Sequence, residues 1–198
     1  MAKATFIKAA RKDIYVQGKL VEATHERGKN AGQKYWKRDR TQPADADDKI
    51  LIHKGESYWT WAFMNGPQMY SKTAPRQSQL TRSEFMSTYY SIMEEVEDWN
   101  PEFQDGEDVL EEFIDTITEE LEELRDETQD RLDNMPESLQ DSDTGQLLQE
   151  RIDECDSLID DFGAIDTTPD YDEEATDEEK EEWWEDKVQE MKDICFNL

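Results

Sequence analysis

The chain has 198 residues and a formal net charge of −29, from 51 acidic and 22 basic side chains. Its apolar runs are only a few residues long, whereas a membrane-spanning helix needs about 20, and its two cysteines make no disulfide framework or zinc site. We therefore expect neither a membrane protein, nor a disulfide-stapled secreted domain, nor a zinc finger. Because residues 1–13 lack the apolar segment of a signal peptide, we expect a cytoplasmic location.

The charge is divided unevenly along the chain. Residues 1–82 contain 16 basic and 8 acidic side chains, whereas residues 83–198 contain 6 basic and 43 acidic ones. The composition thus predicts two domains, a basic head over 1–82 and an acidic domain over 83–198. Such asymmetry is typical of proteins that contact nucleic acid or imitate it.

The head begins with two basic segments, 8–13 and 29–40, the second of which contains Tyr35 and Trp36. Cations interleaved with aromatic rings are able to hold phosphates while bases stack. A solvated basic surface with two aromatic residues in a small core is the alternative. The candidate nucleic-acid-binding residues are Arg11, Lys12, Lys34, Tyr35, Trp36, Lys37, Arg38 and Arg40.

Residues 41–48 are predicted to form a polar loop, after which the pattern becomes that of short strands. Strands over 50–52, 58–63 and 68–72 predict a small antiparallel sheet of two or three strands. Trp59, Trp61 and Phe63 fall on one face at a period of two. This aromatic face is either the core of the sheet, which we favour, or a platform for stacking.

Three segments of the head, KAARKD (8–13), KGESYWTW (54–61) and SKTAPRQSQLTRSEF (71–85), resemble segments of an uncharacterised family of bacteriophages and some bacteria. The resemblance covers about residues 1–95. It implies a phage-related origin. It assigns no functional residue and says nothing of the acidic domain.

Four helices are expected in the acidic domain, over about 82–99, 107–135, 144–162 and 177–196. Thr81 and Thr176 are the expected N-caps of the first and last, each with a glutamate three residues on. Asp105-Gly106 is expected to open the second helix and Gly163 to cap the third. The second and third carry heptad seams, which predicts an antiparallel coiled-coil-like hairpin and an α+β fold overall. The seam of the second helix comprises Leu110, Ile114, Ile117, Leu121, Leu124, Thr128, Arg131 and Met135.

The side of the second helix opposite its seam is dense in carboxylates. Like charges at helical spacing repel one another, so retaining many of them costs stability unless a partner or salt screens them. A row of carboxylates on a rigid helix competes for the Lys and Arg groups that otherwise bind phosphate. The candidate partner-binding residues are Glu112, Glu119, Glu122, Glu123, Asp126 and Asp130.

Sequence signatures of catalysis and of nucleotide binding are missing, and we expect no cofactor, no metal site and no enzymatic activity. Cys155 and Cys195 lie on apolar stripes and are expected to be buried thiols. The favoured hypothesis is a phage-encoded DNA mimic that binds a basic host protein and inhibits host defence or host DNA transactions. Two alternatives stay open: a nucleic-acid-binding protein with a regulatory acidic tail, and an assembly protein that self-associates through its helical hairpin.

Overall fold

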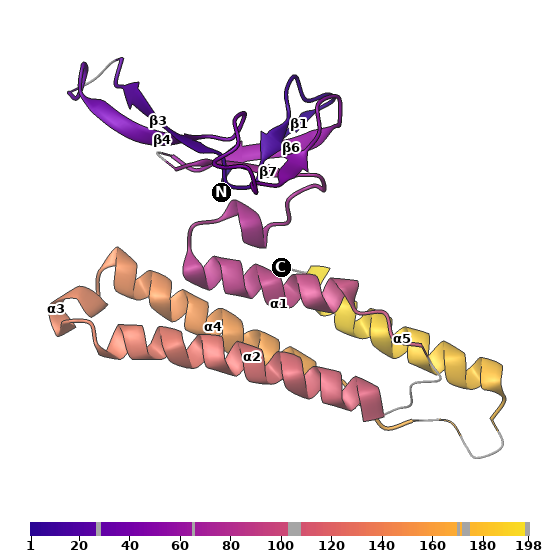
Figure 1. Cartoon of the computed structure of the whole chain (residues 1–198). Coiled ribbons are helices and arrows are strands. Elements are labelled where there is room, and N and C mark those ends of the chain that lie inside the picture. Colours follow the sequence, from indigo (N-terminus) through magenta and orange to yellow (C-terminus); the bar gives the residue numbers. More distant parts are fainter. Residues whose placement is uncertain (27–28, 65, 103–107, 170, 172–174, 197–198) are drawn as a thin grey trace. The chain divides into compact units, whose positions relative to one another are not determined.

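The computed structural model describes residues 1–26, 29–64, 66–102, 108–169, 171 and 175–196. The chain divides into two compact units, Met1–Arg82 and Ser83–Leu198, named the N-terminal and the C-terminal unit. The described strands lie in the first and the α-helices in the second, which confirms the α+β class (Figure 1). The division falls where the sequence changes from basic to acidic.

The described residues of the N-terminal unit form short strands that pair antiparallel in three small sheets. Their bounds are β1 Thr5–Ile7, β2 Ile14–Tyr15, β3 Lys19–Thr24, β4 Lys34–Asp39, β5 Ile50–Ile52, β6 Tyr58–Ala62 and β7 Gln68–Ser71. The sheet orders are β1-β6-β7, β2-β5 and β3-β4. A 3-10 turn, η1 (Ser78–Leu80), follows β7.

The strand pairing differs from the single predicted sheet at both β5 and β6, and strands β1 to β4 were not predicted. Strand β6 pairs with β7 as predicted, but β5 pairs with β2, and β1 lies on the other edge of β6. Strands β1 and β2 have three and two residues, which is too short for an apolar–polar alternation to be recognised. The sequence therefore carries little signal for the partners of β5 and β6.

Aromatic side chains of β6 contribute to the small core of this unit. Trp61 is only 5% exposed, and Trp59 packs on Phe6 of β1 with ring centroids 5.2 Å apart. On the other side of the strand, Tyr58 packs with Tyr70 against a buried cluster. That cluster comprises Ala10, Ile14 and Ile52. Of the aromatic face predicted from the sequence, Trp61 is thus buried while Trp59 and Phe63 are half-buried, and the buried cluster lies on the Tyr58 side of the strand.

In its described residues the C-terminal unit is a bundle of four long helices and one short one (Figure 1). The bounds are α1 Glu84–Asp98, α2 Asp108–Asp133, α3 Glu137–Gln140, α4 Asp143–Gly163 and α5 Asp177–Phe196. The long helices match the predicted ranges to within two residues at each end. Helix α2 lies against α4 as an antiparallel hairpin, and the short α3, which the sequence did not predict, forms part of the connection between them.

One of the two predicted N-caps is wrong. Helix α1 is capped by Ser83, whose Oγ accepts a hydrogen bond from the N–H of Met86 at 3.3 Å, and Thr81 lies outside the helix. The box at α5 is confirmed: the carboxylate of Glu179 accepts from the N–H of Thr176 at 2.8 Å, and Thr176 Oγ1 accepts from the N–H of Glu179 at 3.3 Å.

Two further predicted helix ends concern glycines. Asp105-Gly106, expected to open the second helix, lies outside the described residues. Gly163 is the last residue of α4 rather than its cap, and Ala164 takes the C-cap position. The end at Gly163 differs from expectation only in detail, because assigned helix ends shift by one or two residues.

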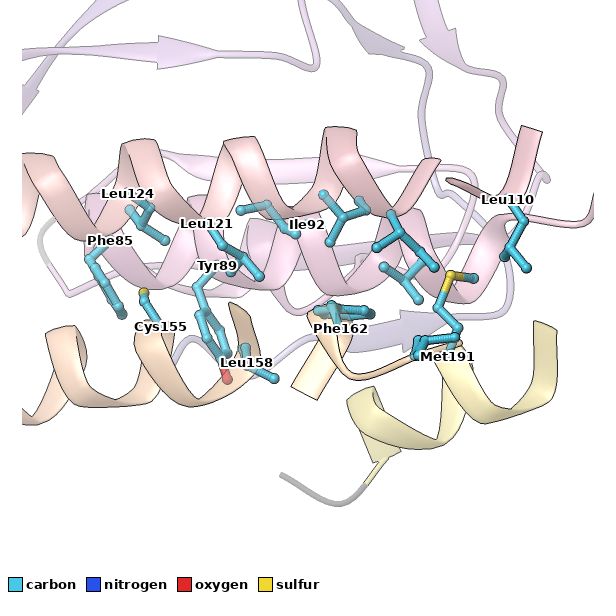
Figure 2. Close-up of a cluster of buried hydrophobic side chains, with 14 of the residues drawn as sticks. Phe85, Tyr89, Ile92, Leu110, Leu121, Leu124, Cys155, Leu158, Phe162 and Met191 are labelled. Carbon is cyan, nitrogen blue, oxygen red and sulfur yellow. The ribbon is translucent and has the colours of Figure 1, made fainter. Parts of the chain in front are cut away.

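Apolar seams hold the hairpin together. Along α2 the seam is buried through Thr128 and ends where Arg131 is exposed. On α4 the buried positions include Leu158, and the neighbouring Ile159 is half-buried. Figure 2 shows these side chains meeting those of α1 and α5, including Phe85, Tyr89 and Met191. Each fully buried Leu, Ile or Phe contributes about 1.5–3 kcal/mol, so the seam is the main stabilising feature of this unit.

Candidate partner-binding surfaces

The predicted partner-binding carboxylates all lie exposed on α2. With about 100° between successive residues of an α-helix, five of them fall within an arc of about 60° opposite the buried seam, and Glu122 lies on the flank of that arc. The helix is held in this rotation because its seam is buried against the bundle. The six residues, named the α2 stripe, are Glu112, Glu119, Glu122, Glu123, Asp126 and Asp130.

One of the six carboxylates of the α2 stripe forms an ion pair within the chain. Asp126 is paired with Arg125, whose Nη2 lies 2.9 Å from its carboxylate. For the other five carboxylates, no lysine or arginine nitrogen of the described residues lies within 4 Å. Five of the six predicted residues are thus available to a cationic partner, and Asp126 would first have to leave Arg125.

The arginines of the hairpin link helices to one another. Arg125 reaches Asp156 of α4 at 3.3 Å, and Arg131 reaches Glu84 of α1 at 3.0 Å. Arg151 of α4 lies over the ring of Phe85 in α1, 4.7 Å from its centroid. The three arginines of the hairpin therefore already contact acidic or aromatic side chains of the C-terminal unit, Asp126 of the α2 stripe among them, and the outward side of α2 stays anionic.

The hairpin has a linear charge density comparable with that of nucleic acid. Helices α2 and α4 together carry 19 carboxylates and 3 arginines. Over the length of α2, about 39 Å at 1.5 Å per residue, this is one net negative charge per about 2.4 Å. Duplex DNA carries one per about 1.7 Å of axis, and a single strand one per about 3.4 Å. A cationic cleft that accepts nucleic acid would meet a similar charge density on the hairpin.

Carboxylates of α4, which were not among the predicted site residues, extend this anionic surface. They were detectable from the sequence, since they occupy the side of α4 away from its own seam. One of them, Asp156, accepts from Arg125 of α2, so the two helices contribute to one surface. Exposed members of this set include Asp153, Asp156, Asp160 and Asp161.

Glu120 is the partly buried carboxylate beside the α2 stripe. Burial raises its pKa above the ordinary value, and the negative charges of Glu95 on α1 and Glu123 on α2 raise it further. Glu120, at the contact of α1 with α2, is thus a residue whose pKa reports the crowding of like charges predicted from the sequence.

Only some of the candidate nucleic-acid-binding residues of the head lie on one element. Residues 34–38 lie on strand β4, which pairs with β3 as a two-stranded ribbon. Arg11 and Lys12 are exposed in the connection between β1 and β2, and Arg40 lies beyond β4 over the ring of Tyr70, 5.7 Å from its centroid. The alternation of β4 also places Lys34, Trp36 and Arg38 on one face and Tyr35 and Lys37 on the other.

The base of this ribbon is fixed by a buried carboxylate. Asp48, from the segment predicted as a polar loop, accepts backbone N–H groups of Gln17 at 2.9 Å, Gly18 at 2.8 Å and Ala44 at 2.9 Å. Burial alone would raise the pKa of Asp48, but these three donors and nearby Arg40 bring it below its ordinary value. Gly18 has a φ of +73°, and a Cβ there would meet the backbone of Arg40. These contacts fix the backbone of the N-terminal unit at the end of the ribbon where β3 begins and β4 ends.

Other chemistry is sparse in the described part of the chain. No group of three or more His, Cys, Asp or Glu side chains there is arranged to hold a metal ion. Burial raises the pKa values of the Cys155 and Cys195 thiols to about 11, so both are thiols at neutral pH. None of the described helices is long and apolar enough to cross a membrane.

Comparison with known proteins gives no match to a family model, to a curated protein or to a solved structure. The functional argument therefore depends on these two surfaces, the α2 stripe and the β3–β4 ribbon.

Proposed function

We propose that the C-terminal unit is a non-enzymatic binding module that occupies the nucleic-acid site of a basic partner protein, as a DNA mimic does. The observation that carries the proposal is the α2 stripe, a row of exposed carboxylates on the side of the helix turned away from its buried seam. A fixed row of charges meets a cationic cleft without first being ordered, so little conformational entropy is lost on binding.

Two features support this reading over a merely solvated acidic surface. The arginines of the hairpin bind within the bundle, and the hairpin approaches nucleic acid in linear charge density. The resemblance of the N-terminal segments to a phage family adds a biological setting, in which the partner is a bacterial protein and binding inhibits host defence or DNA metabolism.

The proposal is tested by capture and competition. The full chain is immobilised, incubated with bacterial lysate, and washed with duplex DNA at low and at moderate salt. We expect retained basic proteins that duplex DNA releases, with retention falling steeply as salt rises, because many exposed charge pairs are screened together. Proteins that stay bound in the presence of duplex DNA would contradict the proposal.

A matched pair of variants separates the α2 stripe from acidity in general. One changes the six residues of the stripe to Gln or Asn. The other changes six exposed carboxylates of α5, Glu178, Glu181, Glu182, Glu185, Asp186 and Glu190. Each set includes one carboxylate that is already paired, Asp126 with Arg125 and Glu190 with Lys187. We expect the stripe variant to lose the captured proteins and the α5 variant to keep them. Equal retention by both would leave the assembly-protein hypothesis as the better one.

A further inference from the structure

The β3–β4 ribbon exposes two large apolar side chains on one face. The register pairs Leu20 with Arg38, Glu22 with Trp36 and Thr24 with Lys34, and directly paired residues share a face of the ribbon. These six residues are named the Trp36 face. Trp36 is 66% exposed and Leu20 is 56% exposed, whereas Trp61 and Ile52 of the same unit are buried. An indole left open in this way is available to a ligand.

Cations flank the indole at regular spacing. Lys34 and Arg38 lie two residues to either side of Trp36 on the same strand and the same face, about 7 Å away along the strand. Glu22, opposite Trp36, is the acidic group of this face, and Lys34 neutralises it at 3.2 Å. The Trp36 face thus combines an aromatic plane with a cation on each side.

The opposite face of the ribbon is arranged differently. The ring of Tyr35 is stacked on His25, with centroids 4.3 Å apart, so this aromatic plane already has a partner within the chain. In the described part of the chain, no ring pairs with Trp36. The two faces therefore differ in which ring is open, although each carries basic side chains.

We propose that the Trp36 face binds single-stranded nucleic acid. An unpaired base stacks on the indole of Trp36, and the phosphates on either side of that base pair with Arg38 and Lys34. Stacking of bases on aromatic rings beside a basic track is the common way of binding single strands without sequence preference. A base inside a duplex is already stacked on its neighbours, so a flat indole in the middle of a strand favours an unpaired one. This site is independent of the α2 stripe.

The test measures binding of the full chain to a fluorescently labelled oligothymidylate at low salt, by anisotropy. Replacing Trp36 with Ala is expected to weaken binding about 5- to 150-fold, the range of one base stack, and Trp36→Phe should keep most of it. Glu22→Gln should tighten binding, because it removes the acid on this face and frees Lys34. Since all of these side chains are exposed, the variants should fold like the parent, which circular dichroism checks.

Controls distinguish the site from general attraction between charges. Arg38→Gln and Lys37→Gln each remove one positive charge from neighbouring positions on opposite faces, so we expect the first to weaken binding several-fold more than the second. The proposal is overturned if the full chain does not bind the oligonucleotide, if Trp36→Ala binds like the parent, or if Lys37→Gln loses as much as Arg38→Gln. Equal or tighter binding of a duplex would also overturn it.

Discussion

Glu120 illustrates at the scale of one residue how the acidic unit balances its charges. It is partly buried and close to Glu95 and Glu123, and these surroundings raise the pKa of its carboxyl. For a carboxyl with a raised folded-state pKa, the linked stabilisation is fully present below the unfolded-state pKa, about 4.3, and is lost as the pH rises through the folded-state pKa. At neutral pH the charged form therefore reduces the stability of the contact between α1 and α2.

Replacing Glu120 with Gln is expected to stabilise the C-terminal unit at pH 7. Removing a repulsive pair contributes a few tenths of a kcal/mol, or about 1–2 °C in Tm, and the gain should shrink towards pH 4, where the carboxyl of the parent is itself protonated. Thermal unfolding followed by circular dichroism measures both. The control is Glu119→Gln, which removes the same charge from an exposed position and should gain less. A lower Tm for Glu120→Gln at pH 7 would contradict this account.

Single residues were also where sequence reasoning about helix ends succeeded or failed. At α5, only Thr176 precedes a glutamate at the required spacing, and the box forms. At α1, Thr81 and Ser83 compete, and the spacing of Glu84 favours Thr81, yet Ser83 is the cap. Thr81 follows directly on η1 and has an extended backbone. The capping pattern of side chains does not predict the 3-10 turn, so it does not show that the helix begins after Ser83.

At the scale of elements, helices were predictable and most strands were not, for a physical reason. The three–four spacing of Leu110, Ile114 and Ile117 is a local property of the chain, and it is present before any partner helix is known. Strands β3 and β4 are mainly exposed, so they lack the apolar–polar alternation that marks a half-buried strand. The α2 stripe was predictable with its helix, whereas the separation of Tyr35 from Trp36 on two faces required the strand assignment.

The α2–α4 hairpin should depend on its seam far more than on its ends. Leu121 is fully buried, and Leu121→Ala is expected to destabilise the unit by about 2–5 kcal/mol, from lost burial and the cavity left behind. Leu139 of α3 is 50% exposed, and Leu139→Ala should stay within about 0.5 kcal/mol of the parent. Urea unfolding midpoints compare the two. If both variants unfold at the midpoint of the parent, the seam does not hold the hairpin.

At the scale of the whole molecule, charge repulsion within the C-terminal unit should make its stability depend on salt. Residues 83–198 carry 43 acidic and 6 basic side chains, and the Debye length falls from about 30 Å at 0.01 M salt to about 8 Å at 0.15 M. The Tm of the helical transition of the full chain is therefore expected to rise over this range of NaCl. A Tm that falls would mean that ion pairs such as Arg131 with Glu84 outweigh the repulsion.

The C-terminal unit should also fold without the N-terminal one. Among the described residues, its buried cluster comprises side chains from Phe85 onwards. The interhelical ion pairs of Arg125 and Arg131 both lie within the unit. A chain of residues 83–198 alone is therefore expected to be helical at neutral pH and moderate salt, with one cooperative transition by circular dichroism. Leu121→Ala in the same chain serves as the control, because a packed unit loses Tm on that change and a set of unpacked helices does not. A coil spectrum at moderate salt would mean that the helices require the N-terminal unit in order to form.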